Sequence, residues 1–218
     1  MKRIIGFLMI MLVLAGCAED KPAKEAEAKN NTEKKEQVQT ASYLDGYLEN
    51  PQLSDDSELL QVDQVVEDSK GRSMLMKMRQ VDETYQIGGI EMKIQDAKWI
   101  QLRPSYRMID YFHGLTDNES EFNYVKVFVE ITNTSDKTLK FSPVALVETN
   151  EEEKISWEDE LYLESLNEPI ESGESRKGNI GFIVDETKDL SELTILTSDI
   201  YDEADNKLND AEEITVEF

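Results

Sequence analysis

Two side chains with readily interpreted chemistry occur once each in this 218-residue sequence, Cys17 and His113. Cys17 stands between an apolar run over residues 4–14 and a charged stretch, and Lys2 and Arg3 precede the run. A positive beginning, a short apolar run and small residues at a cleavage point are the features of a secretory signal. The run is shorter than the roughly 20 apolar residues that a membrane-spanning helix needs. The thiol of Cys17 therefore lies where a processing reaction could use its nucleophilic sulfur.

Residues 14–17, Leu-Ala-Gly-Cys, resemble the lipobox of bacterial lipoproteins. The resemblance implies that a diacylglycerol is attached to Cys17 and that residues 1–16 are removed as a lipoprotein signal peptide. It also implies that the protein is held at the cell membrane, on its extracytoplasmic face. Each buried CH₂ group contributes about 0.8 kcal/mol, so two or three acyl chains such as palmitate anchor a protein stably where one does not. We therefore expect Cys17 to be the lipid attachment site.

His113 lies in residues 103–121, which read RPSYRMIDYFHGLTDNESE. Pro104 followed by Ser105 predicts the start of a short helix with Ser105 as its cap. Four apolar residues then share one helical face by their spacing, namely Met108, Tyr111, Phe112 and Leu115. We favour a structural role for this helix, as a plug at one open end of the domain.

Two functional alternatives remain for the same segment. In the first, a candidate binding surface is formed by Tyr106, Tyr111, Phe112 and His113, because aromatic residues on loops often recognise partners. In the second, Ser105, Asp110 and His113 form a hydrolytic set, and the protein is a cell-surface hydrolase that uses residues 105–121. No nucleophile-elbow motif accompanies Ser105. We therefore expect no catalytic residues and no enzyme activity.

We also expect no metal site and no cofactor. One histidine and one lipidated cysteine cannot supply the soft ligands of a zinc or copper site. Residues 117–121 and 202–206 are rich in oxygen ligands, but neither stretch has the spacing and glycine of a calcium loop. We favour solvated turns over calcium binding at both places.

The charge of the chain restricts its partners. The net charge is −24, and removal of residues 1–16 would take away two further cations. Nucleic acid is excluded as a partner because its binding depends on Lys and Arg. Docking of the folded part on anionic lipid is disfavoured because the negatively charged headgroups repel an acidic protein. The partners that remain are the membrane through its lipid anchor, an envelope protein and a basic partner.

The composition divides the chain into parts. Residues 17–42 comprise the lipidated cysteine and a charged linker without aromatic residues, and we expect this linker to be a disordered stalk. Residues 43–58 are a transition, for which we expect a short helix or a packed arm. Residues 59–218 form a single domain of ordinary size.

Alternation with a period of two dominates the domain and predicts an all-β fold. Residues 124–131 alternate most regularly, which predicts a half-buried strand with Lys126 and Glu130 on the side away from the core. The turn at residues 133–137 predicts a hairpin that continues through Leu139 and Phe141. A change of parity after Ile94 predicts a β-bulge near Gln95-Asp96. Many short strands with turns between them indicate a β-sandwich or a barrel.

Three stretches resemble a known kind of domain: residues 87–100, 122–143 and 171–186. The first is IGGIEMKIQDAKWI, the second ends its strand in Asn-Thr-Ser, and the third contains Gly173-Glu174, Gly178 and Phe182. Together they resemble the telokin-like, immunoglobulin-like domain of uncharacterised lipoproteins from Gram-positive bacteria. The resemblance implies an immunoglobulin-like sandwich outside the cytoplasm, here with a short helical insertion, and it supplies no catalytic residues. The sequence therefore predicts a lipid-anchored binding or structural module of the cell envelope.

Overall fold

The structure is a computed structural model, and it describes residue 44 and residues 47–162, 164–184 and 187–218. The expected signal peptide, Cys17 and the stalk over residues 17–42 lie outside the described residues. None of the helices in the described part of the chain is both long enough and apolar enough to cross a membrane.

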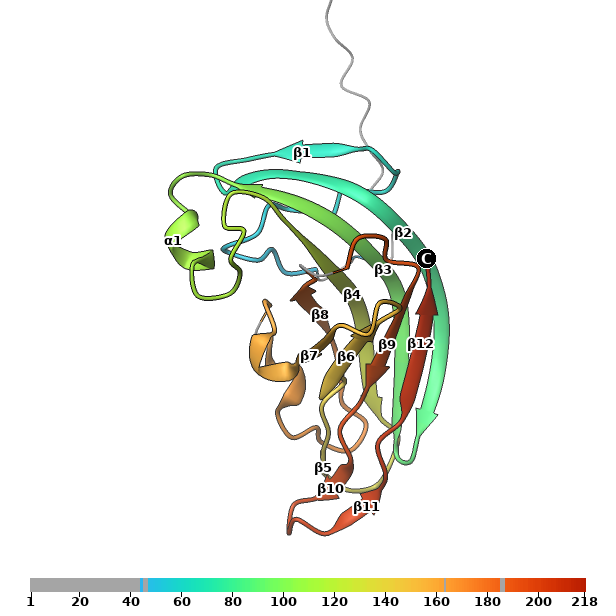
Figure 1. The fold of residues 1–218 in the computed structure, drawn as a ribbon. Coiled ribbons are helices and arrows are strands. Elements are labelled where there is room, and N and C mark those ends of the chain that lie inside the picture. Colours follow the sequence, from blue (N-terminus) through green and yellow to red (C-terminus); the bar gives the residue numbers. More distant parts are fainter. Residues whose placement is uncertain (1–43, 45–46, 163, 185–186) are drawn as a thin grey trace, which may run out of the picture. The chain divides into compact units, whose positions relative to one another are not determined.

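The first layer of the fold is a five-stranded antiparallel sheet (Figure 1). Its strand order is β1-β2-β3-β4-β8, and β2 and β3 are long strands joined by a tight turn at Gly88-Gly89. The bounds are β1 Val65–Glu67, β2 Gly71–Ile87, β3 Ile90–Pro104, β4 Phe122–Asn133 and β8 Ser175–Ile183. Gly88 has a φ of 54°, a conformation that glycine adopts without strain.

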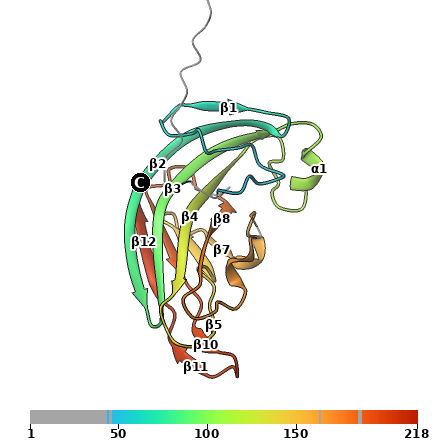
Figure 2. The same cartoon turned by 180° about the vertical axis from the view of Figure 1, so that it is seen from behind.

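The second layer lies on the concave side of the long strands (Figure 2). It contains a four-stranded sheet in the order β12-β9-β6-β7 and a three-stranded sheet in the order β11-β10-β5. The bounds are β5 Leu139–Lys140, β6 Leu146–Thr149, β7 Lys154–Ser156, β9 Glu192–Leu196, β10 Ile200–Asp202, β11 Lys207–Asn209 and β12 Glu213–Glu217. The layers enclose an apolar cluster, the sandwich core, that includes Trp99, Val127 and Ile195. The predicted all-β sandwich is confirmed.

The predicted bulge in β3 is confirmed and decides which side chains face the sandwich core. The register between β3 and β4 shifts between Ile94 and Asp96. Before the shift Ile94 faces the sandwich core, and after it Ala97 and Trp99 do so. Because side chains alternate along a strand, Asp96, Lys98 and Ile100 face the opposite side of the sheet.

This opposite side is covered by residues 47–59, which we call the arm. Leu53 and Leu59 of the arm are buried against β3 and β4. The resulting second cluster, the arm core, contains Leu53, Leu59, Leu75, Ile100, Leu102, Phe112, Phe122, Tyr124, Leu161 and Tyr162. The prediction for Lys126 is therefore wrong: its side chain is fully buried, because the arm covers the face that the strand pattern assigned to solvent.

The predicted hairpin after β4 is also wrong. β5 pairs with β10 and not with β4, so residues 133–139 carry the chain from one layer to the other. Asn133 holds this crossover, since its Nδ2 donates to the carbonyl oxygens of Lys137 at 2.7 Å and Ile170 at 2.9 Å. Leu139 and Phe141 then continue the sandwich core.

Candidate functional site

Three fully buried ionic side chains lie between the arm and the five-stranded sheet, and we call Asp56, Lys98 and Lys126 the buried ion cluster. Lys98 and Lys126 are direct neighbours on β3 and β4. The Oδ2 atom of Asp56 lies 2.8 Å from Nζ of Lys98 and 2.6 Å from Nζ of Lys126. Lys98 Nζ also donates to the backbone oxygen of Asp56 at 2.7 Å. One residue of the arm thus binds two cations of the sheet.

The surroundings of the cluster keep Asp56 ionised. Burial alone would raise the pKa of Asp56, but the adjacent ammonium groups of Lys126 and Lys98 outweigh it and hold the pKa below its ordinary value. Tyr47 donates its hydroxyl to Oδ1 of Asp56 at 2.6 Å, and burial together with this carboxylate raises the pKa of Tyr47. Burial lowers the pKa of Lys98, although Asp56 and the buried Asp96 counteract it.

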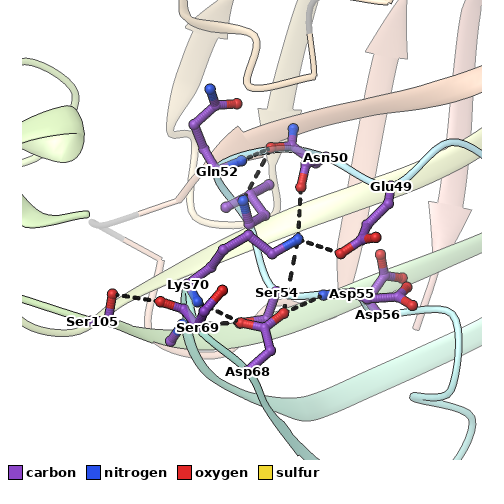
Figure 3. Close-up of polar contacts among 12 residues, drawn as sticks. Glu49, Asn50, Gln52, Ser54, Asp55, Asp56, Asp68, Ser69, Lys70 and Ser105 are labelled. Atoms are coloured by element: carbon purple, nitrogen blue, oxygen red, sulfur yellow. Dashed lines mark hydrogen bonds and ion pairs between the residues drawn. The ribbon is translucent and has the colours of Figure 1, made fainter. Parts of the chain in front are cut away.

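The arm has a second attachment, at the turn between β1 and β2 (Figure 3). Lys70 donates to Oε1 of Glu49 at 2.6 Å and to the backbone oxygen of Asn50 at 2.9 Å. From the same turn, Asp68 accepts hydrogen bonds from Ser54 Oγ at 3.0 Å and from the backbone N–H of Asp55 at 3.3 Å. These contacts and the buried ion cluster fix the arm along its length. We call the cluster a lock for the arm. All three ionic groups are closed to solvent, so a shift of the arm would leave buried charges unpaired.

The structure places three of the four residues of the candidate binding surface at the surface and buries the fourth. The helix in the insertion is short, α1 Ile109–Phe112, and Met108 is its N-cap. Tyr106 is 90% exposed and Tyr111 38% exposed, and His113 is an exposed residue whose Nδ1 contacts Glu119. Phe112 is fully buried in the arm core, so its assignment to a binding surface is wrong. The ring of Phe112 points inward because the apolar side chains of the arm core surround it, and it packs on the ring of Phe122 on β4.

Two of the residues of the alternative hydrolytic set have other partners. Ser105 does not cap the helix, because its Oγ donates to the backbone oxygen of Ser69 at 3.0 Å. The imidazole of His113 contacts Glu119. Among the described residues, no hydrogen bond joins Ser105, Asp110 and His113.

A large open cavity adjoins the insertion. Its volume is about 580 Å³, and it is lined by residues 113–118, 153–155, 159 and 183. Asp117, Glu153 and Asp159 contribute carboxylates to its wall, against Lys154 and His113. The cavity therefore favours a basic over an acidic ligand.

A smaller cavity lies beside Trp157, and nothing in the sequence analysis predicted it. It occupies about 130 Å³ between β8, which is an edge strand, and the segment with the short helices η2 Trp157–Asp159 and η3 Ser165–Asn167. A second hollow of about 180 Å³ shares four lining residues with it, Ser142, Val144, Trp157 and Asn167. The sequence signal was a tryptophan next to the carboxylates of Glu158, Asp159 and Glu160.

Glycines of β8 let Tyr162, Glu164 and Leu166 lie close to the sheet. A Cβ atom at Gly178 would lie 2.4 Å from Oε2 of Glu164, and one at Gly181 would lie 2.7 Å from the ring of Tyr162. Gly173, in the preceding turn, has a φ of 75°. Phe182 belongs to the sandwich core. The glycines and Phe182 of the third family-like stretch therefore have structural roles, as does Asn133 of the second.

Oxygen-rich turns do not gather into a metal centre in the described part of the chain, where no group of three or more His, Cys, Asp or Glu side chains is placed to hold an ion. In the turn at residues 202–206, Asp202 Oδ1 accepts hydrogen bonds from the backbone N–H groups of Ala204 and Asn206, each at 2.9 Å.

The fold and site define an all-β sandwich whose main sheet carries a locked arm on its second face. The comparisons with known proteins assign it to a family. Residues 79–207 match the model of a domain of unknown function, DUF4352, and the chain belongs to this family. It is 38% identical to the "Uncharacterized protein YdhF" of Bacillus subtilis (strain 168), with all of both chains covered.

Two solved structures show weaker similarity. A functionally unknown protein from Listeria monocytogenes EGD-e is 12% identical with a TM-score of 0.47, covering 67% of this chain and 86% of that one. A conserved hypothetical protein from Bacillus anthracis is 9% identical with a TM-score of 0.37, covering 61% and 95%.

Proposed function

We propose that this protein is a lipid-anchored binding or structural module of the cell envelope, attached through Cys17 to the extracytoplasmic face of the membrane. The observation that carries the proposal is the signal-like sequence that ends in the only cysteine of the chain. The immunoglobulin-like class of the sandwich, which the resemblance implies, is part of the same proposal.

The arm supports the proposal because it is the part of the described domain nearest in sequence to the expected stalk. Asp56 and Lys70 hold the arm to β1–β4 through buried or half-buried contacts. A stalk joined to this arm would be connected to the five-stranded sheet through these contacts, so a force on the lipid anchor would be transmitted to the folded domain.

The binding role is assigned to the insertion and its cavity. Tyr106, Tyr111 and His113 are exposed there, and the adjoining cavity of about 580 Å³ carries several carboxylates. A basic partner or a basic patch on an envelope protein fits this charge. The proposal gives the insertion no catalytic role, in keeping with the separate partners of Ser105 and His113.

The anchor is tested by Cys17→Ser in the full chain, with labelled palmitate and fractionation of cells. We expect the wild type to take up label and sediment with membranes, whereas the variant keeps residues 1–16 and takes up no label. Persistent labelling of the variant would contradict attachment through Cys17.

The binding surface is tested by a photo-crosslinking residue at position 106 in cells, with the same residue at Leu208, 44% exposed on β11, as the control. We expect a discrete crosslinked envelope component from position 106 and none from position 208. Equal products from both positions would refute the surface. His113→Ala should leave most of this crosslink in place, because Tyr111 and the crosslinking residue at position 106 remain on the surface, whereas a hydrolase that depends on His113 would lose its turnover.

A further inference from the structure

We infer that the cavity beside Trp157 binds a protonated alkylamine, with its ammonium group between Glu164 and the Trp157 ring. This cavity is separate from the insertion, and its residues carry no part of the proposed anchor. A lysine side chain of another protein and a free polyamine share this chemistry.

Glu164 supplies the charge of the site. It is half-buried, and its Oε1 accepts a hydrogen bond from Nδ2 of Asn179 at 3.0 Å. In the described part of the chain, no lysine or arginine lies within ion-pair distance of Glu164. The cation with the strongest influence on it is Lys126, which is held by Asp56 at 2.6 Å. Burial raises the pKa of Glu164, as expected for a carboxylate that lacks a close cation.

Trp157 supplies an aromatic platform. Its side chain is 54% exposed, whereas the other tryptophan of the chain, Trp99, is 4% exposed. The backbone holds it in place, since its N–H donates to the oxygen of Ala145 at 3.1 Å and Ser156 caps the short helix η2. A cation over a tryptophan face is the most favourable of the cation–π arrangements.

The rest of the wall favours a hydrogen-bond donor. None of the described residues that line the cavity is a lysine or an arginine, and Glu160 adds a second carboxylate. Asn179 also lines it and is buried. Its Nδ2 donates to Glu164, while its Oδ1 has no hydrogen-bond partner among the residues that the structure describes. An ammonium group carries three donors and no acceptor, and an anion would meet two carboxylates.

The dimensions fit a head group with part of its stem. The cavity of about 130 Å³ corresponds to the liquid volume of about four water molecules. The adjoining hollow of about 180 Å³ is lined in part by Val144 and Ala145, against which methylene groups can pack.

The test uses the full-length chain in an uncharged detergent and the protection of Trp157 from acrylamide quenching. The probes are 1,5-diaminopentane, for a free amine, and the peptide acetyl-Gly-Lys-Gly-amide, for a side chain. The matched control is the same peptide with Nε-acetyl-lysine, which keeps the stem but has no charge. We expect one or both amine probes to protect Trp157 and the acetylated peptide to bind at least about tenfold more weakly. Trp157→Phe should remove the signal, because Trp99 is buried.

Two variants separate the site from general attraction to an acidic protein. Glu164→Gln should weaken the amine probe by about tenfold or more, while its side-chain oxygen can still accept from Asn179. Glu158→Gln removes an exposed charge beside Trp157 that does not line the cavity, and it should leave the affinity unchanged. Equal losses in both variants, equal binding of the acetylated peptide, or no binding of either amine would overturn the inference. The comparison of probes on the wild type holds even if Glu164→Gln fails to fold.

Discussion

The two faces of the five-stranded sheet are buried by different means. The face toward the second layer is covered by side chains of the sandwich core, such as Val127, Leu193 and Ile195, which are all apolar. The other face combines the apolar arm core with the buried ion cluster. Val127 and Lys126 are adjacent on β4 and point to opposite faces of the sheet. The side chain of Val127 is buried among apolar residues, whereas that of Lys126 is buried as a charge beside Asp56.

This difference separates stability from specificity. Apolar contacts stabilise a layer in proportion to the area that they bury, and they tolerate small shifts of one layer on another. A buried carboxylate between two lysines tolerates no such shift, because an unpaired ion in the interior is costly. We therefore interpret the buried ion cluster as the feature that sets the position of the arm, and the leucines of the arm as the source of its stability.

The largest effect is expected from Asp56→Ala. The change leaves the ammonium groups of Lys98 and Lys126 buried without their common partner, so the free energy of unfolding should fall by about 3–5 kcal/mol. The neighbouring Asp55→Ala is the control and should change it by less than about 1 kcal/mol. Urea denaturation followed by circular dichroism measures both. Equal stability of the two variants would mean that the ions do not position the arm.

A matched pair of leucines compares the two cores. Leu59 in the arm and Leu193 on β9 are both fully buried, and replacement of either by alanine should cost about 2–5 kcal/mol. Native-state hydrogen exchange should distinguish them. Leu59→Ala should accelerate exchange mainly in the arm, as at the N–H of Leu53, whereas Leu193→Ala should accelerate it throughout the sandwich. Uniform acceleration by Leu59→Ala would show that the arm is no separate unit.

Subtraction of the profile of Asp56→Asn from that of the wild type isolates the contribution of the Asp56 charge to the acid side of the pH profile, including its effect on the buried Lys98. The pKa of Asp56 in the folded state lies below the ordinary 3.8, so its stabilisation is fully present above about pH 4 and is lost as the pH falls toward the folded pKa. The slope is about 1.4 kcal/mol per pH unit in that window. The difference in unfolding free energy between wild type and Asp56→Asn, measured from pH 5 to pH 2, should therefore shrink with falling pH. A difference that is constant with pH would contradict the depressed pKa.

The sandwich could be predicted from the sequence because its strands obey local rules. The alternation over residues 124–131 and the change of parity after Ile94 depend on neighbours in the chain. They correctly predicted the strand β4 and the bulge in β3, although the alternation placed Lys126 on the wrong side of the burial boundary. The crossover at Asn133 could not be predicted, since a turn cluster looks the same whether the next strand pairs back or joins another sheet. Contacts distant in the sequence distinguish these outcomes, such as the hydrogen bond of Asn133 with Ile170, 37 residues away, and the pairing of β5 with β10.

The buried ion cluster was missed for a similar reason. A lysine that alternates with valines is assigned to solvent unless another segment covers it. Here the covering segment is the arm, whose Asp56 precedes Lys126 by about 70 residues in the chain. The alternation of Asp96 and Lys98 after the bulge was the available signal, because it places charges opposite Lys126 on a neighbouring strand. Phe112 was assigned to a surface because its burial depends on the same arm core. The cluster of aromatic residues in the insertion correctly indicated the exposed Tyr106. It could not show which of the neighbouring aromatic side chains would be buried.

The smallest effect is expected at an exposed ion pair on the same sheet. Lys77 on β2 lies 2.7 Å from Asp189, and both side chains are partly exposed. Because water screens such a pair, Asp189→Ala, which leaves the bond of Lys77 to the backbone oxygen of Leu190 in place, should cost only about 0.2–1 kcal/mol, and 1 M salt should abolish most of that difference. Lys98→Ala, measured in parallel, should cost several times more and respond little to salt, since its partner Asp56 is closed to solvent. A strong salt dependence of the Lys98 effect would mean that water reaches the cluster, and the arm would then be a mobile cover and not a lock.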